Sequence, residues 1–243
     1  MKPFRFDGRR GSPVVVAHRG APDRALENSL ASFAAAVADG ADMIEFDVRL
    51  SADGAAVVVH DARTGRTAKE NVPVASATAA RLRRVRLKNG EPLPFLADVL
   101  DLVGGKVPVN VESKAPGAMA AVARALRDAE YPGEVLLSSG LRDECLAARA
   151  HLPDLPCGLV TGRPSASDLA FCRRHGLASI HPDYRALSVL RTRKVREAGL
   201  RLVPYTVNAA ALFFRLADSG ADGIFSDRAE ALRAAWRERR LGR

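Results

Sequence analysis

Short apolar runs alternate along this chain with longer stretches rich in Ala and Leu, and this alternation limits the possible folds more than any other feature. The runs are rich in Val, Ile and Leu, as expected for strands that are buried on both faces. They fall at Val14–Ala17, Met43–Val48, Ala56–Val59, Val107–Glu112, Val135–Ser138, Cys157–Val160, Ser179–His181, Leu202–Tyr205 and Gly223–Ser226. Helical patterns cover residues 28–38, 118–129, 141–150, 167–175, 188–198, 209–219 and 227–239, with Asn28 as the expected N-cap of the first.

Strands that alternate with helices predict a parallel sheet. The chain has 243 residues, close to the roughly 250 of one (β/α)8 barrel. Seven or eight strand–helix units favour this closed TIM barrel over an open doubly wound sheet, which is the alternative. The polar stretch 61–94 exceeds the usual barrel loop and indicates a small insertion after the second strand, near the active face. Since no linker or repeat interrupts the pattern, we expect a single domain over residues 1–243.

The chain carries a net charge of +9, which raises the question of contact with nucleic acid or an anionic membrane. Because the arginines are spread along the chain, with clusters only at Arg81–Arg86 and the C-terminus, we expect solvated faces and no nucleic-acid partner. No apolar run reaches about 18 residues, so we expect no stable membrane insertion. Met1–Gly11 lacks the apolar segment of a secretory signal, and three cysteines without metal-type spacing favour the cytoplasm.

Two carboxylates lie on one face of an otherwise apolar strand, at Glu45 and Asp47. Residues two apart on a strand point the same way, so both side chains share one environment. Like charges buried together are costly unless a cation or an arginine balances them. A divalent cation with oxygen ligands is the simplest remedy, and a salt-bridged pair at the barrel rim is the alternative.

Two histidines also end predicted strands, His18 within Ala17-His18-Arg19-Gly20 and His60 after Val57–Val59. Catalytic groups of a barrel stand at the carboxyl ends of its strands. Asp53-Gly54 predicts a hairpin that folds the His60 segment back onto the carboxylate strand. His18 and His60 are therefore candidate proton carriers, and Arg19 is a candidate phosphate ligand.

A later strand end carries Glu112 and Lys114, again spaced by two. Glu112 is the candidate third acid of the metal site, and Lys114 is placed for a phosphate oxygen. Ser138 and Ser139 lack the context of a nucleophile elbow. We find neither a GxGxxG motif nor a P-loop, which argues against a dinucleotide or nucleoside triphosphate site.

Taken together, these residues resemble the glycerophosphodiester phosphodiesterase family from Val14 to about Asp227. The matching elements are Ala17–Gly20, Glu27–Ser29, Phe33, Gly40–Asp42, Ile44–Val48, Asp53-Gly54, His60-Asp61, Asn110–Lys114, Tyr205–Asn208 and Gly223–Asp227. Leu26, Tyr205 and Gly140 depart from the residues that are common in the family, which are Pro, Trp and Phe.

The resemblance implies a (β/α)8 barrel that binds one divalent cation, Mg2+ or Ca2+, through Glu45, Asp47 and Glu112. It implies His18 and His60 as the general acid–base pair, and Arg19 and Lys114 as phosphate-binding residues. Glu27 is the family's acidic residue near the site, either a further ligand or a residue that orients His18. Tyr205 would offer an aromatic wall for the glycerol carbons.

The implied reaction is metal-dependent hydrolysis of a small-molecule glycerophosphodiester to sn-glycerol 3-phosphate and an alcohol. Two alternatives use the same site. One is phospholipase D-type cleavage of lysophospholipids, and the other is a non-catalytic barrel that binds phosphate esters. The oligomeric state does not follow from the sequence.

Overall fold

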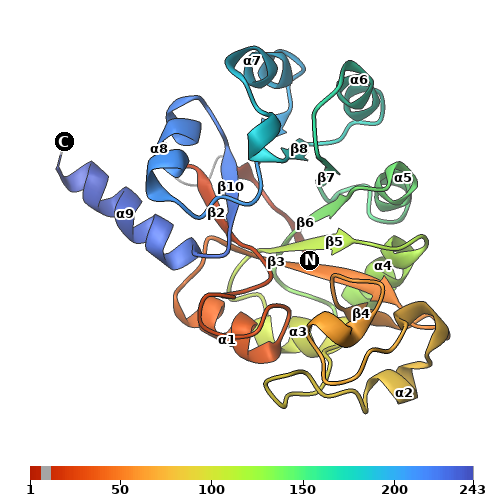
Figure 1. The fold of residues 1–243 in the computed structure, drawn as a ribbon. Coiled ribbons are helices and arrows are strands. Elements are labelled where there is room, and N and C mark those ends of the chain that lie inside the picture. The colour runs from red at the N-terminus through yellow and green to blue at the C-terminus, as the bar shows by residue number, and fades with distance from the viewer. Residues whose placement is uncertain (7–11, 243) are drawn as a thin grey trace.

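Eight parallel strands lie side by side in a ring with helices outside them (Figure 1). This computed structural model describes residues 1–6 and 12–242, so part of the segment Met1–Gly11 lies outside the described residues. The ring strands are β2 (Val14–Ala17), β3 (Met43–Leu50), β5 (Val109–Ser113), β6 (Glu134–Ser139), β7 (Cys157–Thr161), β8 (Ser179–Pro182), β9 (Arg201–Leu202) and β10 (Gly223–Ser226). They are joined in the order β10-β2-β3-β5-β6-β7-β8-β9.

The ring closes between its first and last strands, because β10 pairs with β2 in parallel. On its other side, the Phe225 amide donates to the Pro204 carbonyl at 3.0 Å, just beyond β9. The predicted barrel is therefore confirmed, and the open doubly wound sheet is excluded, since the first strand of an open sheet of this kind does not pair with the last.

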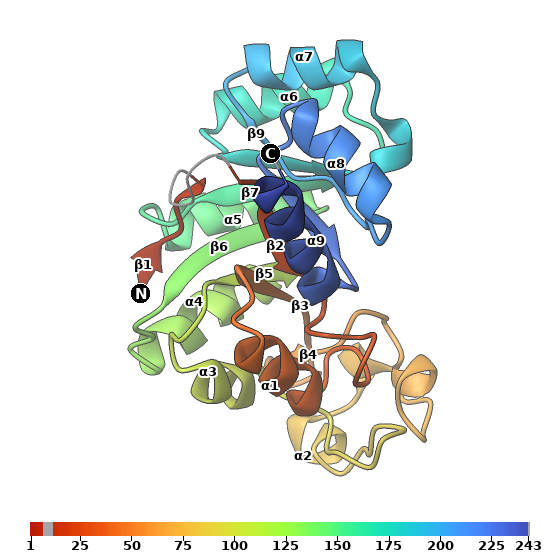
Figure 2. The same ribbon diagram turned by 90° about the vertical axis from the view of Figure 1, so that its left-hand side faces the viewer.

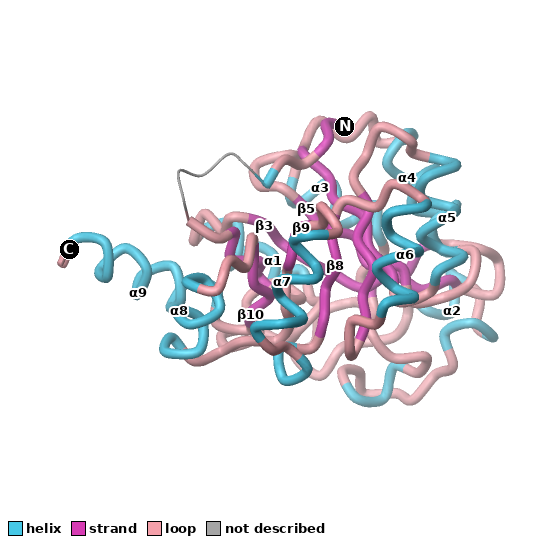
Figure 3. The backbone as a smooth tube through the Cα atoms, turned by 90° about the horizontal axis from the view of Figure 1, so that it is seen from above, coloured by secondary structure: helices cyan, strands magenta, loops and turns pink. Residues whose placement is uncertain are grey.

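One helix follows each ring strand. These helices are α1 (Leu30–Ala38), α3 (Leu96–Val103), α4 (Ala118–Asp128), α5 (Arg142–His151), α6 (Ala166–Arg174), α7 (Val189–Glu197), α8 (Ala210–Asp218) and α9 (Ala229–Leu241). Seen from above, α4, α5 and α6 lie on one side of the strands and α8 and α9 on the other (Figure 3). Among the described residues, no helix is both long and apolar enough to cross a membrane.

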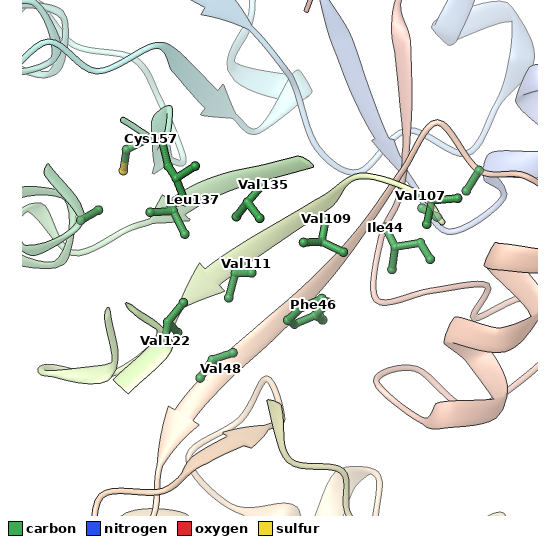
Figure 4. Close-up of a cluster of buried hydrophobic side chains, with 14 of the residues drawn as sticks. Ile44, Phe46, Val48, Val107, Val109, Val111, Val122, Val135, Leu137 and Cys157 are labelled. Atoms are coloured by element: carbon green, nitrogen blue, oxygen red, sulfur yellow. The ribbon is translucent and has the colours of Figure 1, made fainter. Parts of the chain in front are cut away.

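The main hydrophobic core lies between the strands and the helices. Alternate residues of a strand point to opposite faces, so Ile44, Phe46 and Val48 of β3 all point outward, beside Val109 and Val111 of β5 (Figure 4). All five are fully buried, and burial of apolar surface contributes roughly 25 cal/mol per Å². The helix-facing residues thus stabilise the barrel and leave the inward positions free for other chemistry.

The inside of the barrel is apolar at one end and polar at the other. Its amino-terminal end is closed by Phe4, Val14, Val16, Met43, Leu136, Val203 and Phe225. The short strand β1 (Lys2–Pro3) pairs with β6 at this end and brings Phe4 under the barrel. Further along β3, the inward residues are Glu45 and Asp47. The polar part of the interior therefore begins directly after this apolar cluster.

The predicted insertion lies between β3 and β5. The strand β4 (Ala56–Val58) runs antiparallel to β3, which confirms the hairpin expected from Asp53-Gly54. The short elements η2 (Thr64–Arg66), η3 (Val74–Ser76) and α2 (Ala79–Leu82) follow, and they enclose a second hydrophobic cluster with Leu82 and Leu87. In Figures 1 and 2 this region lies on the side of the barrel opposite α6 and α7.

Three local predictions are wrong or incomplete. The N-cap of α1 is Ser29, not Asn28, whose φ of 54° turns its side chain toward the barrel interior. Helix α3 was not predicted; Asp98 caps it by accepting a hydrogen bond from the Phe95 amide at 2.8 Å. Strand β9 ends at Leu202, whereas the predicted strand extended to Tyr205. The regular ladder is interrupted because Pro204 has no N–H to donate.

Candidate active site

Three carboxylates converge inside the carboxyl end of the barrel. Glu45 and Asp47 lie on β3 and Glu112 lies on β5, where it is the register partner of Asp47. One carboxylate oxygen from each lies within 4.8 Å of the others, and all three residues are buried. The strand alternation that the sequence predicts places Glu45 and Asp47 on one face, and the register between β3 and β5 in the structure brings Glu112 beside them.

Two cations face these three acids. The Arg19 Nε lies 3.1 Å from Asp47 Oδ2, and the Lys114 Nζ lies 2.6 Å from Glu112 Oε1 and 3.4 Å from Asp47 Oδ1. Burial would lower the pKa of Lys114, but the charges of Glu112 and Asp47 raise it above its usual range. The sequence predicts Arg19 and Lys114 as phosphate-binding residues. In the structure, both contact the carboxylates directly.

Glu45 is the acid that is least well compensated. Its Oε2 accepts a hydrogen bond from the Arg19 amide at 2.9 Å, whereas its buried Oε1 has no hydrogen-bond partner in the described structure. Burial and the charge of Asp47 raise the pKa of Glu45 to about 8. Three buried oxygen donors with an uncompensated charge fit a divalent cation such as Mg2+ or Ca2+.

The turn after β2 brings the Arg19 backbone to Glu45. Arg19 has a φ of 57° and Gly20 a φ of 93°. A Cβ at Gly20 would lie 2.3 Å from Ser32 Oγ, so only glycine fits this close approach to α1. The Ser32 hydroxyl in turn donates to the Arg19 carbonyl at 3.0 Å, which holds the turn in place.

His18 is held through its Nδ1 by a carboxylate from the opposite end of the sequence. This nitrogen lies 2.7 Å from Asp227 Oδ1, just after β10, and Asn208 Nδ2 donates to Asp227 Oδ2 at 2.8 Å. Burial would lower the pKa of His18, but the hydrogen bond to Asp227 and the charge of Glu45 raise it. With Nδ1 engaged, Nε2 is the nitrogen left for a ligand.

His60 has the same arrangement with a different neighbour. Its Nδ1 lies 2.6 Å from Asp61 Oδ1, and Asp61 Oδ2 accepts from Arg66 Nε at 2.5 Å. Burial lowers the pKa of His60, although Asp47 and Asp61 oppose this. The pKa of Asp61 lies at about 2, because the hydrogen bonds from Arg66 and His60 outweigh its burial. Both histidines are thus oriented by a carboxylate, but only Asp61 is also paired with an arginine.

Glu27 and Asn28 support the charged groups from the loop before α1. Glu27 accepts hydrogen bonds from Arg19 Nη1 at 2.8 Å and from both terminal nitrogens of Arg66. Asn28 Nδ2 donates to Asp47 Oδ2 at 2.9 Å. Glu27 therefore lies beside Arg19, and it is not among the three acids that converge.

The opposite side of the barrel interior is uncharged. Tyr205 is half-buried there, and its hydroxyl donates to the Thr161 carbonyl at 3.3 Å. His181 is fully buried, and burial lowers its pKa to about 3, which keeps the ring neutral. Its Nε2 lies 2.9 Å from Ser179 Oγ. A Cβ at Gly158 would come within 2.5 Å of both side chains.

Sequence reasoning placed Asp61, Asn208 and Asp227 within the motifs shared with the family but did not identify their hydrogen-bond partners. Asp227 directly follows β10, whereas Asp61 and Asn208 lie in the segments that come after β4 and β9. A barrel places its functional groups in such segments. That rule identifies them as candidates. The partners of Asp227, however, are His18 and Asn208, which lie 209 and 19 residues away in the sequence. The pairing is therefore visible only in the folded chain.

Comparison with known proteins agrees with this geometry. The model of the glycerophosphoryl diester phosphodiesterase family matches residues 18–231. A glycerophosphodiester phosphodiesterase of Caldanaerobacter subterraneus is 29% identical over 90% of this chain and 96% of its own. A second, from Bacillus subtilis, is 29% identical over 88% of this chain and 83% of its own.

Among solved structures, an Oleispira antarctica phosphodiesterase in complex with the product sn-glycerol 3-phosphate superposes with a TM-score of 0.87. The two sequences are 25% identical, and the match covers 93% of this chain and 97% of the other.

Proposed function

Because this chain belongs to the glycerophosphoryl diester phosphodiesterase family, we propose that it hydrolyses glycerophosphodiesters to sn-glycerol 3-phosphate and an alcohol. The observation that carries the proposal is the convergence of Glu45, Asp47 and Glu112 within 4.8 Å inside the barrel mouth. The similar Oleispira antarctica enzyme, solved with sn-glycerol 3-phosphate, supports the identity of the product.

Glu45, Asp47 and Glu112 would hold one divalent cation, Mg2+ or Ca2+. Their oxygen donors and the unpartnered Glu45 Oε1 fit such an ion. Bound there, it supplies positive charge that offsets the negative charge developing on the phosphate.

Arg19 and Lys114 bind and orient the phosphate in this scheme. Both contact Asp47 from different directions, so their cationic groups border the same small volume as the three acids. Glu27 holds Arg19 at 2.8 Å and limits the motion of its guanidinium. Tyr205 faces the glycerol carbons from the uncharged side.

His18 and His60 move the protons. One takes the proton of the attacking hydroxyl, whose oxygen bonds to phosphorus, and the other gives a proton to the alcohol oxygen as its bond to phosphorus breaks. Each transfer contributes about 10² to 10⁴ in rate. We assign the donor role to His18, since Asp227 is bonded to a neutral amide and its charge stays available to an imidazolium.

Asp61 differs because Arg66 shares its charge, which suits a neutral His60 that accepts a proton. Both water and the substrate's own glycerol hydroxyl fit as the nucleophile. In the second route the hydroxyl displaces the alcohol to form a cyclic glycerol phosphate, and water must then open the ring to give sn-glycerol 3-phosphate. Detection of the cyclic phosphate in the reaction mixture would identify this route.

The cytoplasm is the compartment that we propose. Cys145, Cys157 and Cys172 are free and buried, which suits a reducing environment.

The test is a panel of glycerophosphodiesters and lysophospholipids, assayed with EDTA and again after Mg2+, Ca2+ or Mn2+ is restored. We expect release of sn-glycerol 3-phosphate that stops with EDTA and returns with a divalent ion. Full activity in EDTA would contradict the metal site. Binding of the diesters without any turnover would indicate a phosphate-ester-binding barrel, and turnover of lysophospholipids alone would indicate the phospholipase D-type reaction.

A further inference from the structure

Two large apolar side chains are strongly exposed beside each other at the start of α7. Val189 is 85% exposed and Leu190 61%. Helix α7 follows β8 through the short element η4 (Tyr184–Ala186), so its first turn lies on the face where the strands end. This is also the face that holds the candidate active site. Single exposed apolar residues are ordinary, whereas this adjacent pair forms a small apolar patch at the rim of the mouth, which makes it a candidate contact surface.

A groove begins at the same rim and runs between α6 and α7. It encloses about 370 Å³. Pro164, before α6, and Leu169 and Ala198 from the two helices supply its apolar lining. Val189 and Leu190 do not line the groove themselves; they directly precede Arg191, the first residue of α7 that does.

Positive charge surrounds this apolar surface. Arg173, Arg191 and Lys194 line the groove together with the acid Glu197. Just before α7, Arg185 has a side chain that is 76% exposed, and its Nε lies 3.4 Å from Asp183 Oδ1. Helix α7 carries one acid, Glu197, and its carboxylate pairs with Arg193 Nε at 2.7 Å. The charge that remains is positive, as it is for the whole chain, at +9.

We propose that this surface, formed by Val189, Leu190 and the α6–α7 groove, docks the protein on an anionic lipid bilayer. The two apolar side chains enter the interface, while Arg185, Arg191 and Lys194 contact lipid phosphates. The charge selects this occupant, because a second copy of the chain would bring the same basic residues together. Duplex nucleic acid would leave Val189 and Leu190 without an apolar partner.

Docking in this way turns the barrel mouth toward the membrane. The inference goes beyond the proposed reaction and does not depend on it. It requires no membrane-spanning segment, since the contact is made by side chains at one helix terminus.

Co-sedimentation with lipid vesicles tests the proposal on the full chain. We expect binding to vesicles of phosphatidylcholine mixed with phosphatidylglycerol, and much weaker binding to phosphatidylcholine alone. The double substitution Val189→Ser and Leu190→Ser should lower the partition coefficient for the mixed vesicles by about tenfold. Hydrolysis of a soluble glycerophosphodiester should be unchanged, because neither residue contacts the charged groups of the site.

Leu146→Ser is the matched control, because Leu146 is an exposed apolar residue on α5, away from the groove. It should bind the mixed vesicles as the unsubstituted chain does. Circular dichroism checks that each variant is folded.

Three outcomes would overturn the proposal. The first is no binding of the unsubstituted chain to the mixed vesicles at physiological ionic strength. The second is equal binding by the double variant, which would leave only a diffuse electrostatic attraction. The third is a dimer that the double substitution converts to a monomer, which would make this surface a contact between copies.

Discussion

The two sides of the barrel mouth differ in charge although they are built from the same strand–helix unit. The side formed by β2, β3, β5 and the insertion carries His18, Arg19, Glu45, Asp47, His60, Glu112 and Lys114. The side formed by β6 to β9 presents Ser138, Gly158, Ser179 and a neutral His181 to the interior. The difference teaches that a few adjacent strands are enough to gather the charged groups, while the remaining strands line the interior with small or neutral side chains.

The strongest test of the difference between the two sides is to substitute one polar side chain on each side and compare turnover. Glu45→Gln removes one charge of the proposed metal site, and we expect turnover to fall by about a thousandfold or more. Ser138→Ala is the control from the uncharged side. Ser138 is fully buried and is the register partner of Glu112. Its hydroxyl has no hydrogen-bond partner in the described structure. Steady-state kinetics should show turnover within about threefold for this variant. Comparable losses in both variants would erase the distinction between the two sides.

Stability without metal provides a second measure of the charged side. The pKa of Glu45 is raised to about 8 in the folded chain, so the folded state holds a proton that the unfolded state loses near its ordinary pKa of about 4.3. The free energy of unfolding of the metal-free protein should therefore fall as the pH rises from about 5 to 8. Denaturant titrations in EDTA should show a loss on the order of 2–4 kcal/mol.

Two controls accompany that titration. Glu45→Gln should flatten the pH dependence, and added Ca2+ or Mg2+ should reverse the loss in the unsubstituted chain. A metal-free protein that is equally stable at pH 5 and pH 8 would show that Glu45 is not held in a costly charged state.

The hydrogen bond between His18 and Asp227 joins the charged side to the last strand of the barrel. Asp227→Asn should lower kcat by about tenfold to a hundredfold with little change in KM, because Nε2 is then oriented less well. It should also shift the pH–rate limb of His18 to lower pH, since Asp227 raises the pKa of His18.

His18→Ala defines the full loss for that site, and Asp227→Asn should retain more activity than it does. A merely structural role for Asp227 would lower the fraction of active enzyme without moving the pH profile.

The smallest effect is expected on the uncharged side, where packing matters more than charge. Gly158→Ala places a Cβ within 2.5 Å of His181 Nε2 and Ser179 Oγ. We expect the free energy of unfolding to fall by about 1–2 kcal/mol, with kcat changed by less than about threefold. Thermal denaturation and kinetics on the same preparation measure both. A large drop in kcat with unchanged stability would mean that this side takes part in the chemistry.

The barrel and the pairing of Glu45 with Asp47 on one face were predictable because both depend on short periodic patterns. The hairpin at Asp53-Gly54 likewise follows from local turn chemistry. The contact with Glu112 depends on the register between β3 and β5, which only the structure gives. The roles of these acids as ligands remain a proposal.

Predictions failed where a local signal competes with a distant partner. Asn28 is a residue type that often caps helices. Its side-chain amide instead donates to Asp47, 19 residues away, and Ser29 caps α1. Helix α3 lies after a long irregular segment, where the expected alternation of strand and helix is interrupted.

The sequence by itself determined the strand–helix alternation, the shared face of Glu45 and Asp47 and the glycine turn after His18, because each depends on residues only a few positions apart. Only the tertiary structure decided that Asp227 holds His18, that Arg66 shares the charge of Asp61, and that Val189 and Leu190 lie exposed beside a basic groove. The physical reason is that charges and exposed surfaces act through distances in space, and barrel closure brings together groups that lie far apart along the chain.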